Sequence, residues 1–254
     1  MNAAIAERFG AAMERARTYD RPLLVIAAIL FVLGILFSMS ASPAATARIR
    51  IEEAFYFAGR QAAYAGLGAI VMLAAASLDP RQLRRGATLV AAIFLPLCLL
   101  ASLFGPEIKG AQRWFEFGVF SMQPSEILKP ALIIVWAWML GESMKQPGFP
   151  GRAVAITIYA LTAAVLLSQP DIGQTALLGM CLAPMLILSG VALRYVLGGG
   201  VLAGLSAWAI YTFYPHARGR VDAFLNPEGD AGYQVSRALD AIAAGGVFGR
   251  GPGE

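Results

Sequence analysis

Charged residues are scarce in this sequence. Of its 254 residues, 14% are Asp, Glu, Lys or Arg and 58% are apolar, with a mean hydropathy of +0.64. A soluble domain carries about 25% charged residues, so the shortage excludes an ordinary soluble globular protein and indicates an integral membrane protein. The net charge of +4 is spread along the chain and forms no long basic run, so no nucleic-acid partner is expected.

Histidine and cysteine are nearly absent. The only histidine is His216, which argues against a histidine-based metal site and against a Ser-His-Asp triad within this chain. Cys98 and Cys181 each lie inside an apolar run, and the sequence has no Cys-x-x-Cys motif. A disulfide framework and a structural zinc site are therefore disfavoured, and we predict no metal-ligating residues.

The apolar runs predict an all-α polytopic helix bundle with about seven transmembrane helices, each near the 20 residues that a bilayer requires. Their expected positions are 22–41, 54–78, a third ending near 104, 126–140, 153–168, a sixth ending near 193 and a seventh ending near 215. Residues 1–21 form a cytoplasmic N-terminal segment, 22–215 the bundle, and 216–254 an extracytoplasmic region without a span. Residues 141–152 are expected to be a polar loop. The acidic residues near the N-terminus argue against a removed signal peptide.

The distribution of Lys and Arg predicts that the N-terminus is cytoplasmic. The whole-chain count ties at ten on each side, but the early segments, which usually dominate, differ. Three basic residues surround the first outer loop, namely Arg48, Arg50 and Arg60. Seven lie in the first two inner segments, namely Arg8, Arg15, Arg17, Arg21, Arg81, Arg84 and Arg85.

Residues 110–130 join two apolar runs and mix charges with aromatic rings. The sequence Gln-Pro-Ser-Glu at 123–126 is typical of a helix start, because proline at the first helical position loses no hydrogen bond. Glu126 and Lys129 are then three residues apart on one helix face and can pair. Such a pair at the head of an apolar helix is a functional candidate by default, although a packing role is slightly favoured.

Two further outer segments carry candidate residues. Asp171, in Gln-Pro-Asp-Ile-Gly, is expected to cap the sixth span, line a polar cavity, or do both. Trp114 is either an aromatic residue of the membrane interface or a platform for a sugar ring. Near the C-terminus, Arg218 and Arg220 lie close to three carboxylates, which fits either a general base with phosphate-binding arginines or a salt-bridged surface loop. From charge alone, the surface loop is preferred.

Four motifs occur in a defined order. They are Gly-Ala-x-Arg-Trp at 110–114, Phe-Ser-x-Gln-Pro-Ser-Glu-x-x-Lys at 120–129, Gln-Pro-Asp-x-Gly at 169–173, and Gly-Tyr-Gln followed by Gly-Gly-x-x-Gly-x-Gly at 232–251. In combination they resemble the shape, elongation, division and sporulation (SEDS) family of bacterial cell-wall glycosyltransferases. The last nine residues are more similar to its division branch, FtsW, than to its elongation branch, RodA.

This resemblance implies a peptidoglycan glycosyltransferase with ten spans in the bacterial inner membrane. It implies polymerisation of lipid II at the outer face during cell division, beside a class B penicillin-binding transpeptidase and other divisome membrane proteins. The family's proposed catalytic aspartate precedes the Gly-Tyr-Gln motif, where this sequence has Asp230. Because the preceding loop is shorter than is typical for the family, Asp222 and Glu228 remain open as the base. Three more family spans, and an outer loop with His-Thr-Asp-Phe, have no counterpart here, which implies a shortened chain.

The resemblance also implies that Glu126, Lys129 and Asp171 line a central cavity and that Trp114 has a functional role. The full set predicted to bind substrate or line the cavity is Arg113, Trp114, Gln123, Glu126, Lys129, Asp171, Arg218 and Arg220. A divalent cation, Mg²⁺ or Mn²⁺, is a candidate helper for the pyrophosphate leaving group. Two other classes stay open: a lipid II flippase or transporter, and a divisome scaffold without catalytic activity.

Overall fold

The computed structural model describes residues 20–108, 111–117, 120–213, 218–219, 221–222, 233–246 and 249. They belong to two compact units. One unit is Asp79–Ser206, and the other combines Met1–Leu78 with Ala207–Glu254. The division falls inside helix α8 (Leu193–Phe213).

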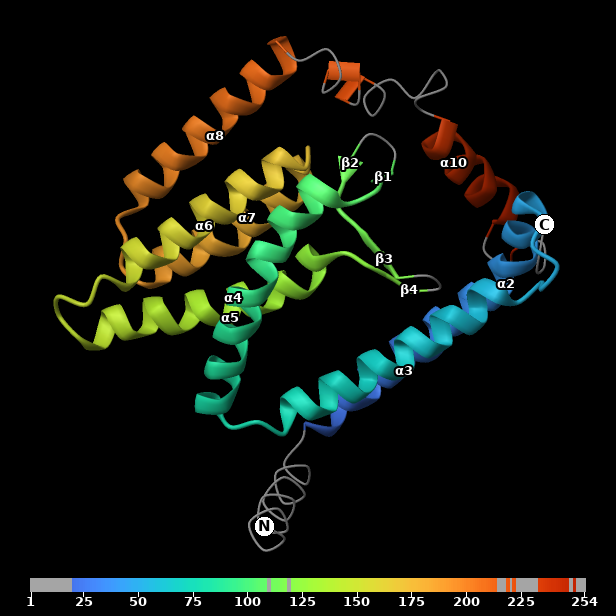
Figure 1. Ribbon diagram of the computed structural model, residues 1–254, viewed down its shortest axis with the longest axis horizontal. Coiled ribbons are helices and arrows are strands. Elements are labelled where there is room, and N and C mark those ends of the chain that lie inside the picture. Colours follow the sequence, from blue (N-terminus) through green and yellow to red (C-terminus); the bar gives the residue numbers. More distant parts are fainter. Residues whose placement is uncertain are drawn as a thin grey trace, which may run out of the picture. The chain divides into compact units, whose positions relative to one another are not determined.

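Helix α5 (Pro124–Lys145) is the centre of the unit Asp79–Ser206. It packs against α4 (Pro80–Phe104), α6 (Gly151–Ser168) and α7 (Ile172–Leu188), as Figure 1 shows. The buried core drawn from these four helices is Cys98, Leu128, Leu132, Trp136, Leu140, Ala155, Leu166, Leu178 and Leu182. Lipid tails are as apolar as these side chains, so close packing rather than escape from water stabilises the contacts.

Local sequence signals set where these helices begin. Asp79 accepts from the backbone N–H groups of Arg81 and Gln82, and the Gln82 side chain accepts from the Asp79 backbone N–H, which completes a capping box for α4. Helix α5 begins at Pro124, as the sequence predicts. Asp171 caps α7 by accepting from the backbone N–H of Gln174 at 3.3 Å, which confirms the predicted capping role.

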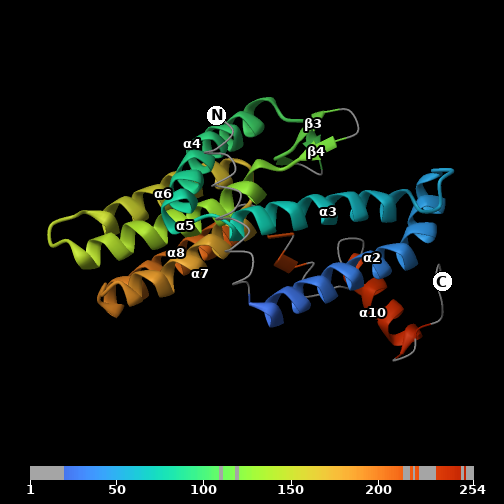
Figure 2. The ribbon, with the colours of Figure 1, turned by 90° about the horizontal axis from the view of Figure 1, so that it is seen from below.

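The second unit contains α2 (Arg21–Ile49) and α3 (Tyr56–Ala76), which contact each other and lie closest near their connection (Figure 2). Their connection is tied back to α2, because the Ser42 hydroxyl donates to the Ala54 carbonyl at 2.8 Å. This unit also contains α10 (Tyr233–Gly245), whose 13 residues are fewer than the roughly 20 that a span needs.

Two short hairpins that the sequence does not predict join α4 to α5. Strand β1 (Glu107–Ile108) pairs with β2 (Ala111–Gln112), and β3 (Phe115–Phe117) pairs with β4 (Phe120–Met122), both antiparallel. Strands of two or three residues are too short to give a detectable alternation of apolar and polar residues. A glycine is needed at 105, because a Cβ atom there would lie 2.8 Å from the Trp114 carbonyl oxygen and 2.4 Å from that of Ala101.

The all-α polytopic fold is confirmed. Every predicted span corresponds to a helix, and five described helices are long and apolar enough to cross a membrane, namely α2, α4, α5, α6 and α8. Helix α7 is apolar but has 17 residues, and α3 has 21 residues that include Arg60 and Gln61. A helix of 17 residues is about 26 Å long, slightly less than the hydrocarbon core of a bilayer.

The predicted loop at 141–152 is wrong in extent. Helix α5 continues to Lys145, and α6 already begins at Gly151. An isolated glycine such as Gly141 costs a helix only about 1 kcal/mol, which neighbouring helix-forming residues offset. Gln146 is the C-cap residue of α5, since Pro147 disfavours a helical conformation of the residue before it.

Leu132 and Ile133 provide a matched test of this packing, because one side chain is fully buried and its neighbour is 37% exposed. Replacing Leu132 by alanine should lower the free energy of unfolding by about 2 kcal/mol or more, since it leaves a cavity in the buried cluster of α4, α5, α6 and α7. Ile133→Ala should cost less than about 1 kcal/mol. Denaturant titration in detergent micelles measures both values, and equal losses would contradict the assigned core.

Candidate functional site

The turn between α6 and α7 is held by one arginine from the segment between β2 and β3. Arg113 donates from Nε to the Gln169 carbonyl and from Nη2 to the Pro170 carbonyl, each at 2.9 Å. Its Nη1 lies 3.1 Å from Oδ2 of Asp171, whose side chain is only 8% exposed. The planar guanidinium thus satisfies two carbonyls at the end of α6 and neutralises a nearly buried carboxylate, for which its fork of donors is suited.

The same turn is anchored to α4 by Gln169. The buried side chain of Gln169 donates from Nε2 to the Cys98 carbonyl at 2.6 Å. Sequence reasoning quoted Gln169 within a motif but assigned it no role. The relevant signal is a glutamine at the end of an apolar run, because a buried amide needs a partner.

A second set of polar contacts joins α5 to α7. Lys129 Nζ lies 2.8 Å from Oε2 of Glu126, which confirms the predicted pair. The Gln174 side chain donates from Nε2 to Oε1 of Glu126 at 2.8 Å. Gln174 also donates its backbone N–H to Asp171, so it links both carboxylates. Gln174 is a site residue that sequence reasoning missed.

These contacts form one continuous polar network, which consists of Arg113, Asp171, Gln174, Glu126 and Lys129. It connects the β2–β3 segment with the first turns of α5 and α7. The Lys129 side chain is 18% exposed and that of Glu126 is 51% exposed, so the network is open to the surroundings at Glu126. The structure therefore joins four of the predicted residues through a fifth.

Helix N-termini and a lysine favour an anionic ligand here. The first turns of two helices present backbone N–H groups and the positive ends of their dipoles, and Lys129 adds a full charge. Two buried polar atoms beside the network, Ser125 Oγ and Gln174 Oε1, have no hydrogen-bond partner within the described residues. An unpartnered carbonyl oxygen and hydroxyl are suited to hydroxyl groups of a ligand or to water.

The described residues do not provide a metal site. No group of three or more His, Cys, Asp and Glu side chains lies together in the part of the chain that the structure describes. Asp171 and Glu126 are instead occupied by Arg113 and Lys129. This donor set does not suit Mg²⁺ or Mn²⁺, which prefer several oxygen ligands.

Two predicted residues flank the network and, in the part of the chain that the structure describes, make no side-chain hydrogen bond or ion pair with it. Gln123 is half-buried and is the N-cap residue of α5, where its backbone carbonyl, not its side chain, accepts from the Glu126 N–H. Trp114 is half-buried directly after Arg113. Both remain predictions as binding residues.

Arg218 belongs to a separate cluster in the other compact unit. Its Nε lies 3.5 Å from Oδ2 of Asp222, and its guanidinium carbon lies 5.6 Å from the centre of the Tyr211 ring. The Tyr211 hydroxyl donates to Asp222 Oδ1 at 2.8 Å. This local arrangement matches the salt-bridged alternative that charge alone favoured. Arg220, Glu228 and Asp230 lie outside the described residues.

Comparison with known proteins identifies close relatives. Residues 21–254 match the sequence model of the cell cycle protein family named for FtsW, RodA and SpoVE. The chain is 41% identical over 239 residues to a probable peptidoglycan glycosyltransferase FtsW from Caulobacter vibrioides. This alignment covers 93% of the chain and 61% of the relative, so the chain spans less than two thirds of that protein's length.

Two solved structures are similar in fold. A chain from a peptidoglycan synthase complex, studied for its coordination of polymerization and crosslinking, has a TM-score of 0.70 and 27% identity. That match covers 90% of this chain and 66% of the other. The rod shape-determining protein RodA of Thermus thermophilus has a TM-score of 0.61 and 26% identity, covering 74% of this chain and 59% of its own.

Substitutions of Arg113 should show whether stability depends on its positive charge alone or also on the geometry of its hydrogen-bond donors. Arg113→Met leaves Asp171 and two carbonyls without their partner and should lower the free energy of unfolding by about 2 kcal/mol, less than a fully buried pair because the site is partly open. Arg113→Lys should restore little of this, since an ammonium cannot reproduce the three-way fork. The double variant Arg113→Met/Asp171→Asn should recover part of the loss. If Arg113→Lys is as stable as the unsubstituted protein in a denaturant titration in detergent, the structural role assigned to the three contacts of Arg113 would be wrong.

Proposed function

The chain belongs to the FtsW/RodA/SpoVE family of cell cycle proteins, and on this basis we propose that the whole protein is a peptidoglycan glycosyltransferase of the FtsW type. It polymerises lipid II into glycan strands at the outer face of the bacterial inner membrane during cell division. The names of its relatives support this activity. The early excess of basic residues supports a cytoplasmic N-terminus.

The polar network at the first turns of α5 and α7 is the observation that best supports this proposal. Lipid II carries a pyrophosphate, and the network combines Lys129 with two helix N-termini, which favour anions. Its position at the ends of two helices fits a substrate whose headgroup lies at the membrane surface and whose tail stays in the bilayer.

The proposed reaction is an inverting displacement. The 4-hydroxyl oxygen of the incoming lipid II sugar forms a bond to the anomeric carbon of the growing, lipid-linked strand. The bond from that carbon to the undecaprenyl pyrophosphate breaks, and the pyrophosphate leaves with the electron pair. Asp230 accepts the proton of the attacking hydroxyl as general base. Asp222 and Glu228 are the alternatives for this role. Asp222 is the less favoured of the two, because its carboxylate already accepts a hydrogen bond from Tyr211.

The contacts suggest different roles for the cations. Arg113 is fully engaged by Asp171 and two carbonyls, so we assign Arg113 and Asp171 a positioning role for the α6–α7 turn. Within the described residues, Lys129 pairs with Glu126, which is 51% exposed, so the lysine can turn toward a pyrophosphate, where it would stabilise the developing negative charge. Arg218 and Arg220 remain further candidates for that role. No step of this proposal depends on a metal ion.

The proposed partners follow from the relatives. A class B penicillin-binding transpeptidase would crosslink the strands as they form, and the similar chain from a peptidoglycan synthase complex supports such a pairing. Other divisome membrane proteins complete the proposed assembly. A transport function is less well supported, because the described network lies at one end of α5 and α7 and not along their length.

The role of Asp230 can be tested by polymerisation of labelled lipid II in detergent by the whole protein with its transpeptidase. Asp230→Asn should lower the rate at least 100-fold, because general-base catalysis contributes about 10²–10⁴. Asp222→Asn tests the alternative base and should retain most activity. Binding of the transpeptidase should be unchanged in both variants. Normal polymerisation by Asp230→Asn would exclude it as the base.

Substitutions of Lys129 should distinguish a role in stabilising the leaving group from a role in packing. Lys129→Gln should reduce polymerisation by about 100-fold, as expected when one charge-stabilising donor is lost. Lys129→Arg, which keeps the positive charge, should restore a substantial part of the rate. If both variants lose activity only in proportion to lost thermal stability, the lysine has a packing role and the proposed assignment is wrong.

If the whole protein without substitutions makes no polymer in an assay where a reference polymerase works, the result would favour the transporter or the scaffold function. A transporter would then move labelled lipid II between leaflets of a vesicle, whereas a scaffold would only bind the transpeptidase.

A further inference from the structure

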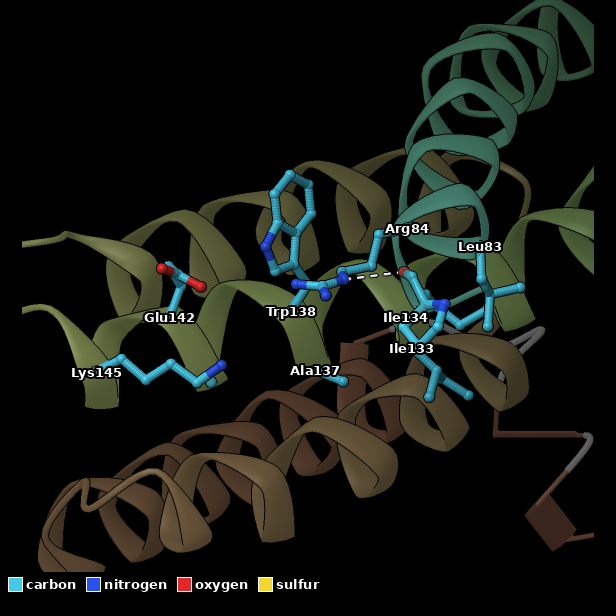
Figure 3. A pocket seen from close by; sticks show the side chains of 10 residues that line it. Leu83, Arg84, Ile133, Ile134, Ala137, Trp138, Glu142 and Lys145 are labelled. Atoms are coloured by element: carbon cyan, nitrogen blue, oxygen red, sulfur yellow. Dashed lines mark hydrogen bonds between the residues drawn. The ribbon is translucent and has the colours of Figure 1, made fainter. Parts of the chain in front are cut away.

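A pocket lies at the opposite end of α5 from the polar network. It has a volume of about 450 Å³ and is formed between the start of α4 and the second half of α5 (Figure 3). Lys145 and Glu126 are separated by nearly the whole of α5, about 28 Å at 1.5 Å per residue. This pocket is therefore distinct from the candidate site for lipid II.

Small residues next to the pocket set how closely the two helices approach. Ala87 of α4 packs with Ala131 and Val135 of α5 in a buried cluster. Beyond that contact, toward Pro80 and Lys145, the two helices leave an open space whose lining includes the small residues Ala137 and Gly141. Leu83 and Ile133 provide apolar walls suited to an acyl chain.

The pocket lies at the level of lipid headgroups. Helix α4 begins at Pro80 and α5 ends at Lys145, so both helices leave the hydrocarbon region here, whichever side of the membrane this is. Trp138, which lines the pocket and is half-buried, is the residue type enriched at this depth.

The charged side chains of the pocket carry a net positive charge. Arg84 donates from Nε to the Pro80 carbonyl at 3.0 Å, and its guanidinium carbon lies 5.8 Å from the centre of the Trp138 ring (Figure 3). No acceptor within the described residues takes its Nη groups, and none pairs with the Lys145 ammonium. Glu142 is the single carboxylate and accepts from the Gln146 amide.

We propose that this pocket binds one anionic phospholipid of the phosphatidylglycerol class. The phosphate lies between Arg84 and Lys145, a glycerol hydroxyl of the headgroup donates to Glu142, and one acyl chain packs on Leu83 and Ile133. Two cations and one carboxylate match a headgroup with a single negative charge.

The other occupants that the chemistry allows are less well matched. A zwitterionic phosphatidylethanolamine could place its ammonium on Glu142, but it would leave one pocket cation without a counter-charge. A hydrophobic helix of a partner protein would bury Arg84 and Lys145 against hydrocarbon, which is unfavourable without a paired acid.

Native mass spectrometry of the purified protein in detergent tests this proposal. Dioleoyl phosphatidylglycerol, phosphatidylethanolamine and phosphatidylcholine would each be titrated, and the apparent affinity of the first bound lipid measured. Phosphatidylglycerol should bind several-fold more tightly than either of the others. Arg84→Gln and Lys145→Gln should each weaken it by about fivefold, as expected for one basic residue at an anionic surface.

Arg85→Gln is the matched control. It removes the same charge from the neighbouring residue of the helix, whose side chain does not line the pocket. It should change the affinity less than twofold. Equal effects of Arg85→Gln and Arg84→Gln would reduce the interaction to general surface charge and overturn the proposal. Preference for phosphatidylethanolamine that disappears in Glu142→Gln would overturn the assigned lipid class. Thermal melting of each variant in detergent identifies any loss that is due to unfolding.

Discussion

The three-way contact of Arg113 with the turn between α6 and α7 is the interaction on which the site depends. Where two membrane helices meet at a turn, the last carbonyls of the first helix lack intrahelical partners, and a carboxylate cap for the second helix adds a charge. The guanidinium answers both requirements, since it donates to two carbonyls and pairs with Asp171. Asp171 is then fixed at the head of α7, and Gln174 one turn later is positioned to reach Glu126.

The opposite end of the α6–α7 pair uses the same chemistry. Arg152, in the first turn of α6, donates to the carbonyl of Ser189, the C-cap residue of α7. Arginines thus hold both ends of this helix pair, each by satisfying carbonyls at a helix C-terminus. Helix α5 carries the polar network near its start and the proposed phospholipid pocket near its end. Any coupling between the two would pass through the packed core around Leu132 and Trp136.

Much of the fold was predictable because its signals are local in sequence. Apolar runs define membrane helices, Pro124 and Asp171 mark helix starts, and Glu126 and Lys129 pair because three residues separate them on one helix. The family was predicted from motif order and is confirmed by the match over residues 21–254. The hairpins before α5 were missed because their strands are too short for a pattern, and α5 was predicted to end too early because the polar, Pro/Gly-containing stretch 141–152 was interpreted as a loop from its first residue.

The sequence by itself determined the membrane class, the helix positions and the family, because hydrophobicity, capping residues and motif spacing are properties of short stretches of chain. Only the tertiary structure decided which polar residues act together. Arg113 and Gln169 are 56 residues apart, and Gln174 and Glu126 are 48 apart. No local pattern encodes such contacts, since each depends on how α5, α6 and α7 pack. The pocket beside Arg84 likewise depends on tertiary packing, because its lining combines residues from the start of α4 with residues from the second half of α5.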